Sequence, residues 1–173
     1  MKGNAQFILD FLAKDPKSGY LMTGPSISPE NWFRTAGGEE MVASMMPACD
    51  RELAYEILSN CVRASEILDT DREFADSLRT AIAQLPPIQL RANGAIREWF
   101  EDFEEAHPNH RHTSHLLACI LFPDHFWRRL PNWRKLPVRL SRIVCLPKTG
   151  RYRMEPCQYD LYVCSVERCA GSI

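Results

Sequence analysis

The 173-residue sequence contains no apolar run close to the roughly 18 residues that a membrane-spanning helix needs. Its N-terminus also lacks the basic segment, apolar stretch and cleavage site of an export signal. The seven cysteines are odd in number and irregularly spaced, so they match no disulfide framework and are expected to be reduced. These absences exclude a membrane-embedded protein and a disulfide-stapled domain. A composition of 45% hydrophobic and 25% charged residues instead predicts one soluble globular domain.

Charge is distributed unevenly along the chain. Residues 126–173 contain ten Lys or Arg and three Asp or Glu, a net charge of +7, and also four of the seven cysteines. Residues 1–125 hold the other eleven bases and nineteen acids, a net charge of -8. One interpretation is a small helical binding module whose basic tail contacts nucleic acid or an acidic partner. The tail shows no convincing amphipathic period or interleaved aromatics, which such a partner would require.

Apolar spacing predicts three helices, over residues 4–14, 47–68 and 71–85. The apolar stripe predicted for the second helix consists of Leu53, Ile57, Cys61, Ala64 and Leu68. The third helix is predicted to bury Phe74, Leu78, Ile82 and Leu85. Because only Asp69 and Thr70 separate these two helices, they should pack antiparallel.

The remaining segments of the body favour shorter elements. Glycines and prolines between residues 20 and 38 predict an ordered loop or short turns. Asn93-Gly94 predicts a small β-hairpin, and residues 115–122 a short helix capped by Thr113 or Ser114. With so few helices available to close a core, the mainly α body is interpreted as a piece of a larger helical architecture.

Two segments could carry chemistry. The first is the loop around Glu30, whose carboxyl group lies near the aromatic residues Trp32 and Phe33 in the sequence. A carboxyl group in apolar surroundings is a candidate general acid. The alternative is an ordinary helix start, with Ser28 as N-cap and Pro29 in the first turn.

The second segment combines acids and aromatics over residues 98–105 with four of the five histidines, within residues 107–115. Carboxylates and ring faces such as Trp99 suit a sugar, because they bind hydroxyls and stack on C–H surfaces. A metal site built on His110, His112 and His115 is the competing hypothesis, although no family spacing for zinc is present. A solvated acidic turn is the third interpretation.

Two motifs at these positions resemble a known family. Residues 4–125 are similar to the catalytic domain of the α-L-fucosidases of glycoside hydrolase family ninety-five, through "DPKSGYLMTGPSISPEN" at residues 15–31 and "EWFEDFEEAHPNHRHTSHL" at residues 98–116. The resemblance implies part of a six-fold α/α toroid, (α/α)6, that inverts the anomeric centre of terminal L-fucose on an oligosaccharide. It implies that Glu30 is the general acid and that Arg111 and His112 bind the sugar hydroxyls. Trp99 is predicted as a further sugar contact.

The resemblance implies no cofactor, metal, nucleic acid or membrane partner, and it leaves open L-galactose as a related substrate. The asparagines and aspartate that serve the base side in this family match nothing here, so the chain is expected to be inactive alone; the parent enzyme is expected to be exported. Codons for Met154–Ile173 and Leu130–Val138, read in shifted frames, can encode peptides similar to the family's next helices. Residues 126–173 are therefore predicted to be an out-of-frame tail with little stable structure.

Overall fold

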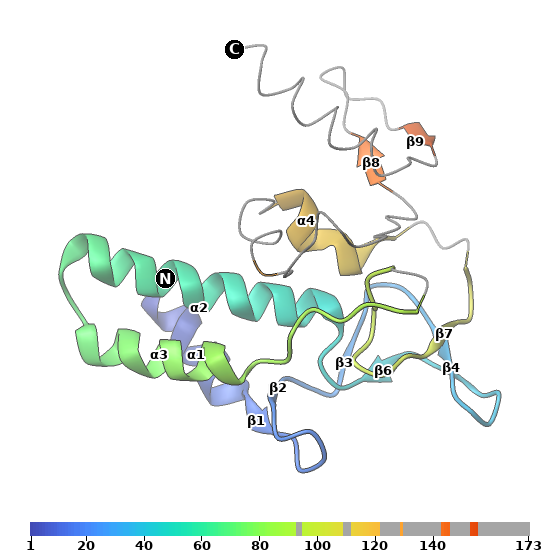
Figure 1. Ribbon diagram of the computed structural model, residues 1–173, viewed down its shortest axis with the longest axis horizontal. Coiled ribbons are helices and arrows are strands. Elements are labelled where there is room, and N and C mark those ends of the chain that lie inside the picture. Colours follow the sequence, from blue (N-terminus) through green and yellow to red (C-terminus); the bar gives the residue numbers. More distant parts are fainter. Residues whose placement is uncertain (93–94, 109–111, 122–128, 130–142, 146–152, 156–173) are drawn as a thin grey trace.

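The computed structural model describes residues 1–92, 95–108, 112–121, 129, 143–145 and 153–155. This part of the chain is mainly helical, with small antiparallel sheets. Its three longer helices are α1 (Lys2–Phe11), α2 (Ala48–Leu68) and α3 (Arg72–Gln84). In Figure 1 they lie together at one end, and the short strands of residues 13–44 lie at the other. None of the described helices is long and apolar enough to cross a membrane.

Helices α2 and α3 form the predicted antiparallel pair. Asp69 ends α2 in the left-handed conformation, with φ of 50°, and α3 begins at Arg72. Leu78 in α3 and Leu85, which follows its last residue, are buried as predicted, whereas Phe74 and Ile82 are only partly buried. The core that these helices enclose consists of Ala5, Met22, Met46, Ala54, Leu58, Cys61, Leu78, Ala81 and Leu85.

The stripe predicted for α2 is wrong in part. Leu53 and Leu68 are 42% and 70% exposed, while the buried line runs through Ala54, Leu58 and Cys61. Both lines have helical spacing, so the sequence alone does not distinguish them. The packing of α1 and α3 onto α2 selects the second line, because small residues there allow close approach.

Helix α1 spans Lys2–Phe11 instead of residues 4–14, because Leu12 is already extended. Only Ala5 is fully buried, and Ile8 and Leu9 pack partly on the core. Phe7 is 64% exposed and stacks on Phe11 at a centroid distance of 5.9 Å. One face of α1 therefore presents aromatic rings to solvent.

The segment predicted as an ordered loop contains strands of two residues each. Strand β1 (Ala13–Lys14) pairs with β2 (Leu21–Met22), and β3 (Ser26–Ile27) pairs with β6 (Ala43–Ser44). The three-stranded sheet has the order β5 (Glu40–Met41), β4 (Phe33–Arg34) and β7 (Glu104–Glu105). Strand β7 brings the distant acidic run next to the Glu30 loop.

The interpretation of Ser28 as a helix N-cap is wrong. Residues 28–32 form a turn between β3 and β4, and no helix begins there. Both flanking strands hold the chain extended, and the Ser28 hydroxyl bonds to Glu98 instead of to a helical amide. An ordinary helix start therefore does not account for this motif.

The later elements follow the predictions more closely. A bridge between Leu90 and Ile96 confirms hairpin pairing, although Asn93-Gly94 lies outside the described residues. The short helix is a 3-10 turn, η1 (Ser114–Leu116), that continues into α4 (Leu117–Leu121). Thr113 is its N-cap residue but makes no side-chain capping bond.

Little of the predicted out-of-frame tail is described. Strands β8 (Ile143–Cys145) and β9 (Arg153–Glu155) pair antiparallel. Arg129, which is 15% exposed, forms an ion pair with Glu52 at 2.8 Å and lies over the Tyr55 ring. The other tail residues to which the prediction of little packing applies lie outside the described part of the chain.

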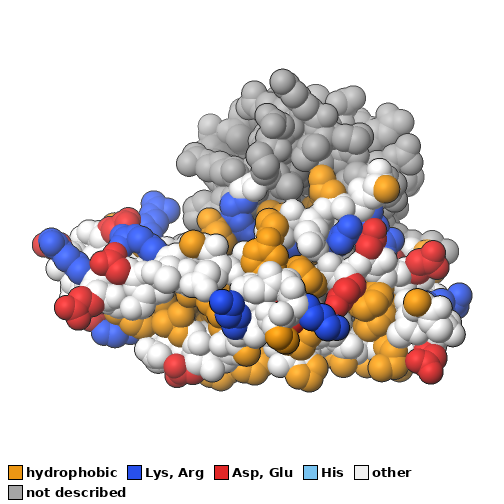
Figure 2. Space-filling view, turned by 60° about the horizontal axis from the view of Figure 1, so that its bottom comes forward, with side chains coloured by type: hydrophobic (Ala, Val, Ile, Leu, Met, Phe, Trp, Pro, Cys, Tyr) orange, Lys and Arg blue, Asp and Glu red, His pale blue; other side chains and the backbone are white. Residues whose placement is uncertain are grey.

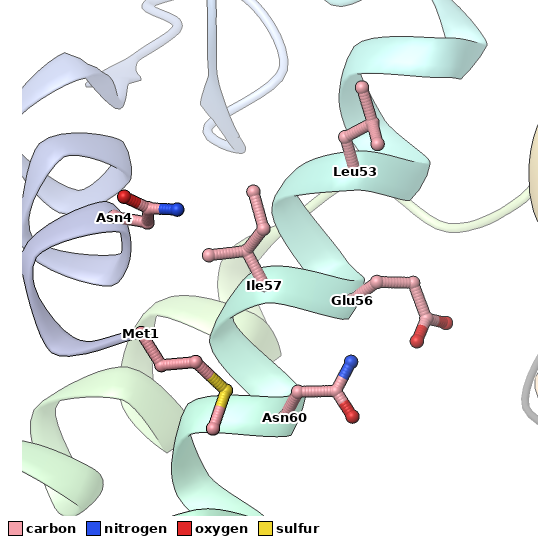
Figure 3. Close-up of a pocket in the computed structure, with 6 residues that line it drawn as sticks. All are labelled: Met1, Asn4, Leu53, Glu56, Ile57 and Asn60. Carbon is pink, nitrogen blue, oxygen red and sulfur yellow. The ribbon is translucent and has the colours of Figure 1, made fainter.

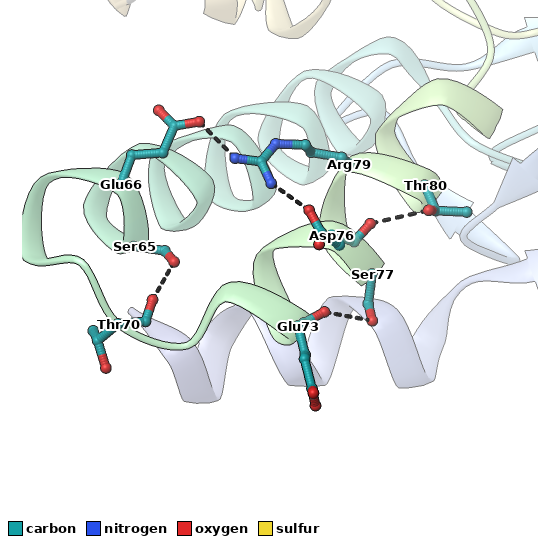
Figure 4. A network of polar contacts seen from close by, with 8 residues as sticks. All are labelled: Ser65, Glu66, Thr70, Glu73, Asp76, Ser77, Arg79 and Thr80. Atoms are coloured by element: carbon teal, nitrogen blue, oxygen red, sulfur yellow. Dashed lines mark hydrogen bonds and ion pairs between the residues drawn. The ribbon is translucent and has the colours of Figure 1, made fainter.

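A surface network joins the exposed sides of α2 and α3 (Figure 4). Arg79 donates 2.6 Å hydrogen bonds to Glu66 on α2 and to Asp76 on its own helix. The Ser65 hydroxyl donates to the Thr70 carbonyl at the connecting turn. Since these groups are solvated, the network contributes little beside the buried core.

Candidate active site

The fold brings Glu30 and His112 together, although the sequence separates them widely. Glu30 Oε2 lies 3.8 Å from His112 Nε2, with side-chain exposures of 64% and 32%. The Ser114 hydroxyl donates a hydrogen bond to the Pro29 carbonyl, so η1 also contacts the loop directly. Arg111, the other predicted sugar ligand, lies outside the described residues. A solvent-accessible carboxyl group thus faces an imidazole across two segments.

Glu98 lies beneath this contact and is only 3% exposed. Its Oε1 accepts a 2.7 Å hydrogen bond from the Ser28 hydroxyl, and its Oε2 accepts a 2.9 Å bond from Asn31 Nδ2. His115 Nδ1 lies 3.2 Å from the same Oε2. The hydrogen bonds attach both sides of the Glu30 turn to one buried carboxylate. Glu98 therefore does not belong to a solvated acidic turn, the third interpretation of this run.

Opposing effects act on the pKa of Glu98. Burial raises the pKa because it disfavours the charged form, whereas the nearby His115 imidazole and the hydrogen bonds from Ser28 and Asn31 lower it. The net pKa lies below the ordinary value for glutamate. Glu98 is consequently an anion at neutral pH and accepts hydrogen bonds without donating one.

The two tryptophans near the loop differ in accessibility. Trp99, the predicted sugar contact, is 2% exposed and packs on Phe33 at 5.3 Å. Its indole nitrogen is buried and has no hydrogen-bond partner among the described residues. Trp32 is 42% exposed, while Asn31 Oδ1 and the Ala106 amide fix its backbone. Of these two tryptophans, Trp32 is therefore the one whose side chain is accessible to solvent.

The histidine cluster does not converge in the described part. His107 is exposed, His112 contacts Glu30, His115 contacts Glu98, and His110 lies outside the described residues. No group of three or more His, Cys, Asp or Glu side chains within the described ranges is arranged to hold a metal ion.

A separate pocket of about 170 Å³ lies between α1 and α2 (Figure 3). Its lining residues are Met1, Asn4, Leu53, Glu56, Ile57 and Asn60. None of them belongs to the Glu30 loop or to the histidine segment, so this pocket is distinct from the candidate site.

Comparison with known proteins decides between these interpretations. Residues 1–132 match the family model described as the glycosyl hydrolase family 95 catalytic domain. The chain belongs to glycoside hydrolase family 95. It is also 40% identical, over 126 residues, to "Alpha-L-fucosidase 2" of Arabidopsis thaliana. That alignment covers 72% of this chain and 15% of the relative, so the family 95 chain corresponds to part of a catalytic domain.

The family match contains every predicted site residue and extends to residue 132, beyond the boundary predicted at residue 125. Sequence reasoning found the Glu30 and His112 motifs but missed the bonds to Glu98, because Ser28 and Asn31 are 70 and 67 residues away from it. A serine and an asparagine on either side of the acid were the available signal: both side chains donate hydrogen bonds, and a buried turn must satisfy them.

Proposed function

We propose that this chain supplies the general-acid side of an inverting α-L-fucosidase site, with Glu30 as the acid. The observation that carries the proposal is the approach of Glu30 to His112, at 3.8 Å, from the two motifs of a family 95 chain. Family membership also favours this function over a basic binding module or a histidine metal site.

The exposure of Glu30 suits its proposed task. An acid that protonates a glycosidic oxygen must reach a substrate that arrives from solvent, and this carboxyl group is 64% exposed on a turn whose flanking side chains are buried. His112, next to Arg111 in the sequence, would bind the fucose hydroxyls on the same side. The sugar would thereby be held while its leaving oxygen faces Glu30.

Inversion also needs a base-activated water on the opposite face of the sugar, with the two carboxyl groups about 6.5–9.5 Å apart. We assign that water to segments of the catalytic domain outside the matched residues, since the match covers 15% of the relative. The proposed substrate is a fucosylated oligosaccharide, and neither the acid nor the base step requires a cofactor.

The surface fits placement within a larger helical toroid. Figure 2 shows apolar side chains distributed over the molecular surface between charged groups. The exposed large apolar residues include Phe7 and Phe11 of α1 and Leu53, Ile67 and Leu68 of α2. Other helices of a six-fold α/α arrangement would bury such faces.

A segment exchange tests this function. Residues 1–125 replace the aligned segment of the Arabidopsis relative, and release of L-fucose from a fucosylated oligosaccharide is measured. We expect the exchanged enzyme to be active, and Glu30→Gln to lower kcat by about 10²–10⁴-fold, because glutamine keeps the shape but has no proton to transfer. Glu73→Gln, on the exposed first turn of α3, is the matched control and should remain within twofold, as surface changes of this kind usually have little effect.

A correctly folded exchanged enzyme in which Glu30→Gln behaves like Glu73→Gln would contradict the assignment of the acid. An exchanged enzyme that folds and binds L-fucose but releases none, even with Glu30 present, would show that this segment does not supply the acid side.

A further inference from the structure

We propose that Glu98 is a positioning residue that sets the place of the acid, a role that rests on the proposed function of Glu30. Glu98 does not face the substrate side, since it is 3% exposed. It acts through the two segments that carry Glu30 and His112, and its carboxylate is the group that both segments share.

The first segment is the turn that carries Glu30. Ser28 and Asn31 are 0% and 1% exposed, and both donate to the Glu98 carboxylate, at 2.7 and 2.9 Å. The backbone N–H of Asn31 also donates a 2.7 Å hydrogen bond to the Ser28 backbone carbonyl and closes the turn. Glu30 is therefore an exposed residue on a turn whose two ends are hydrogen-bonded to the buried Glu98 carboxylate.

The second segment follows His112. His115 Nδ1 lies 3.2 Å from Glu98 Oε2, and Ser114, its neighbour on η1, donates to the Pro29 carbonyl. The backbone carbonyl of Glu98 accepts a 2.8 Å bond from Ala48, the first residue of α2. One residue thus ties the acid turn and the histidine segment to the start of the longest helix.

This geometry predicts that the separation of Glu30 and His112 depends on Glu98. If the carboxylate is lost, each segment keeps its covalent connections but loses the shared acceptor that aligns it with the other. Misplacement of a reacting group by about 1 Å can cost roughly 10²-fold in rate. The expected effect is therefore on turnover more than on substrate binding.

Glu52 provides the matched control. It is also a buried glutamate, 1% exposed and paired with Arg51 and Arg129, at 2.9 and 2.8 Å. Its hydrogen bonds and ion pairs in the described part of the chain are with these two arginines, which belong to neither segment. Glu52→Gln therefore removes a comparable buried charge without touching the acid turn.

The first measurement is amide hydrogen exchange on the 173-residue chain. Glu98→Gln should speed exchange of the Asn31 and Ala106 amides by at least about 10-fold relative to the Leu58 amide in α2, since local opening is separable from global unfolding. Glu52→Gln should change loop and core amides by the same factor. If Glu98→Gln speeds exchange of the loop amides and of the Leu58 amide by equal factors, the proposal would be overturned.

The second measurement is the kinetics of the exchanged enzyme. We expect Glu98→Gln to lower kcat by about 10–100-fold with KM within about threefold, because the acid is misplaced while the sugar contacts remain. Glu52→Gln should leave the ratio of kcat to KM unchanged. If Glu98→Gln does not fold, Ser28→Ala, which keeps the carboxylate and removes one donor, should show a smaller shift in the same direction.

The outcomes separate the two proposals. If Glu30→Gln shows its expected loss of kcat but Glu98→Gln changes kcat no more than Glu52→Gln does, the role of Glu98 alone would be overturned. Selective loop opening in Glu98→Gln together with an unaffected Glu30→Gln would overturn the function of Glu30, while the anchoring of the turn by Glu98 would stand.

Discussion

Replacing Glu98 by glutamine should destabilise the 173-residue chain at neutral pH but not in acid. The folded-state pKa of Glu98 is lowered, so its carboxylate contributes stability above the ordinary carboxyl pKa, and this contribution is lost as pH falls through the folded-state pKa. Glutamine keeps the size of the side chain and one acceptor oxygen. The substitution therefore isolates the effect of the charge.

The contacts of Glu98 set the expected size of the effect. A hydrogen bond to a charged group contributes about 1.5–3 kcal/mol and a neutral one about 0.5–1.5, so weakening the bonds from Ser28 and Asn31 costs roughly 2 kcal/mol. Loss of the His115 contact adds to this cost, and relief of burying a charge subtracts from it. We expect a net loss of about 1–3 kcal/mol at pH 7.5.

The assay is urea unfolding followed by circular dichroism, at pH values from 7.5 to 3. Among the described residues, Cys49 and His115 are titratable groups that face Glu98. Cys49, whose pKa burial raises to about 12, stays neutral throughout this range. The series is repeated with His115→Gln, which removes the imidazole next to Glu98 and leaves the contributions of Ser28 and Asn31. The difference between wild type and Glu98→Gln should vanish in acid; a difference that persists unchanged at pH 3, or a variant more stable at pH 7.5, would refute the reasoning.

Three further outcomes test the packing. Leu78→Ala, at a fully buried position of α3, should cost about 2–5 kcal/mol in urea unfolding, whereas Leu53→Ala should cost much less because that side chain is 42% exposed. Arg129→Ala should lower the free energy of unfolding by about 1.5–3 kcal/mol, because it removes a charged partner of buried Glu52. A change below about 0.5 kcal/mol in the same assay would contradict this contact. Cys49, with a pKa of about 12, should resist alkylation at pH 8 until the chain unfolds, as peptide mass mapping would show.

Helix positions were the part of the fold most open to prediction. Long apolar periodicity located α2 and α3, and Asp69 and Thr70 marked the turn between them. The face that α2 buries was not predictable, because Leu53 and Ala54 both begin lines of helical spacing. Only the helices packed against α2 determine which line is buried.

The site was predictable to the extent that its residues stand in recognisable motifs. Glu30 and His112 were indicated by motifs that resemble those of the family, and the structure brings the two residues together. The role of Glu98 required the fold, since a buried carboxylate and its donors come from distant segments and no local spacing connects them. For the same reason, sequence did not reveal that Trp99 is buried while Trp32 is exposed.

The most direct test of the central claim, that Glu30 protonates the leaving oxygen, is the dependence of the rate on the leaving group. In the exchanged enzyme, kcat/KM is compared between a fucosylated oligosaccharide and a 2,4-dinitrophenyl fucoside, whose leaving group needs no proton. General acid catalysis contributes about 10²–10⁴-fold, so Glu30→Gln should lose that factor on the oligosaccharide and nearly none on the activated fucoside. An equal loss on both substrates would contradict the assignment of Glu30 as the acid.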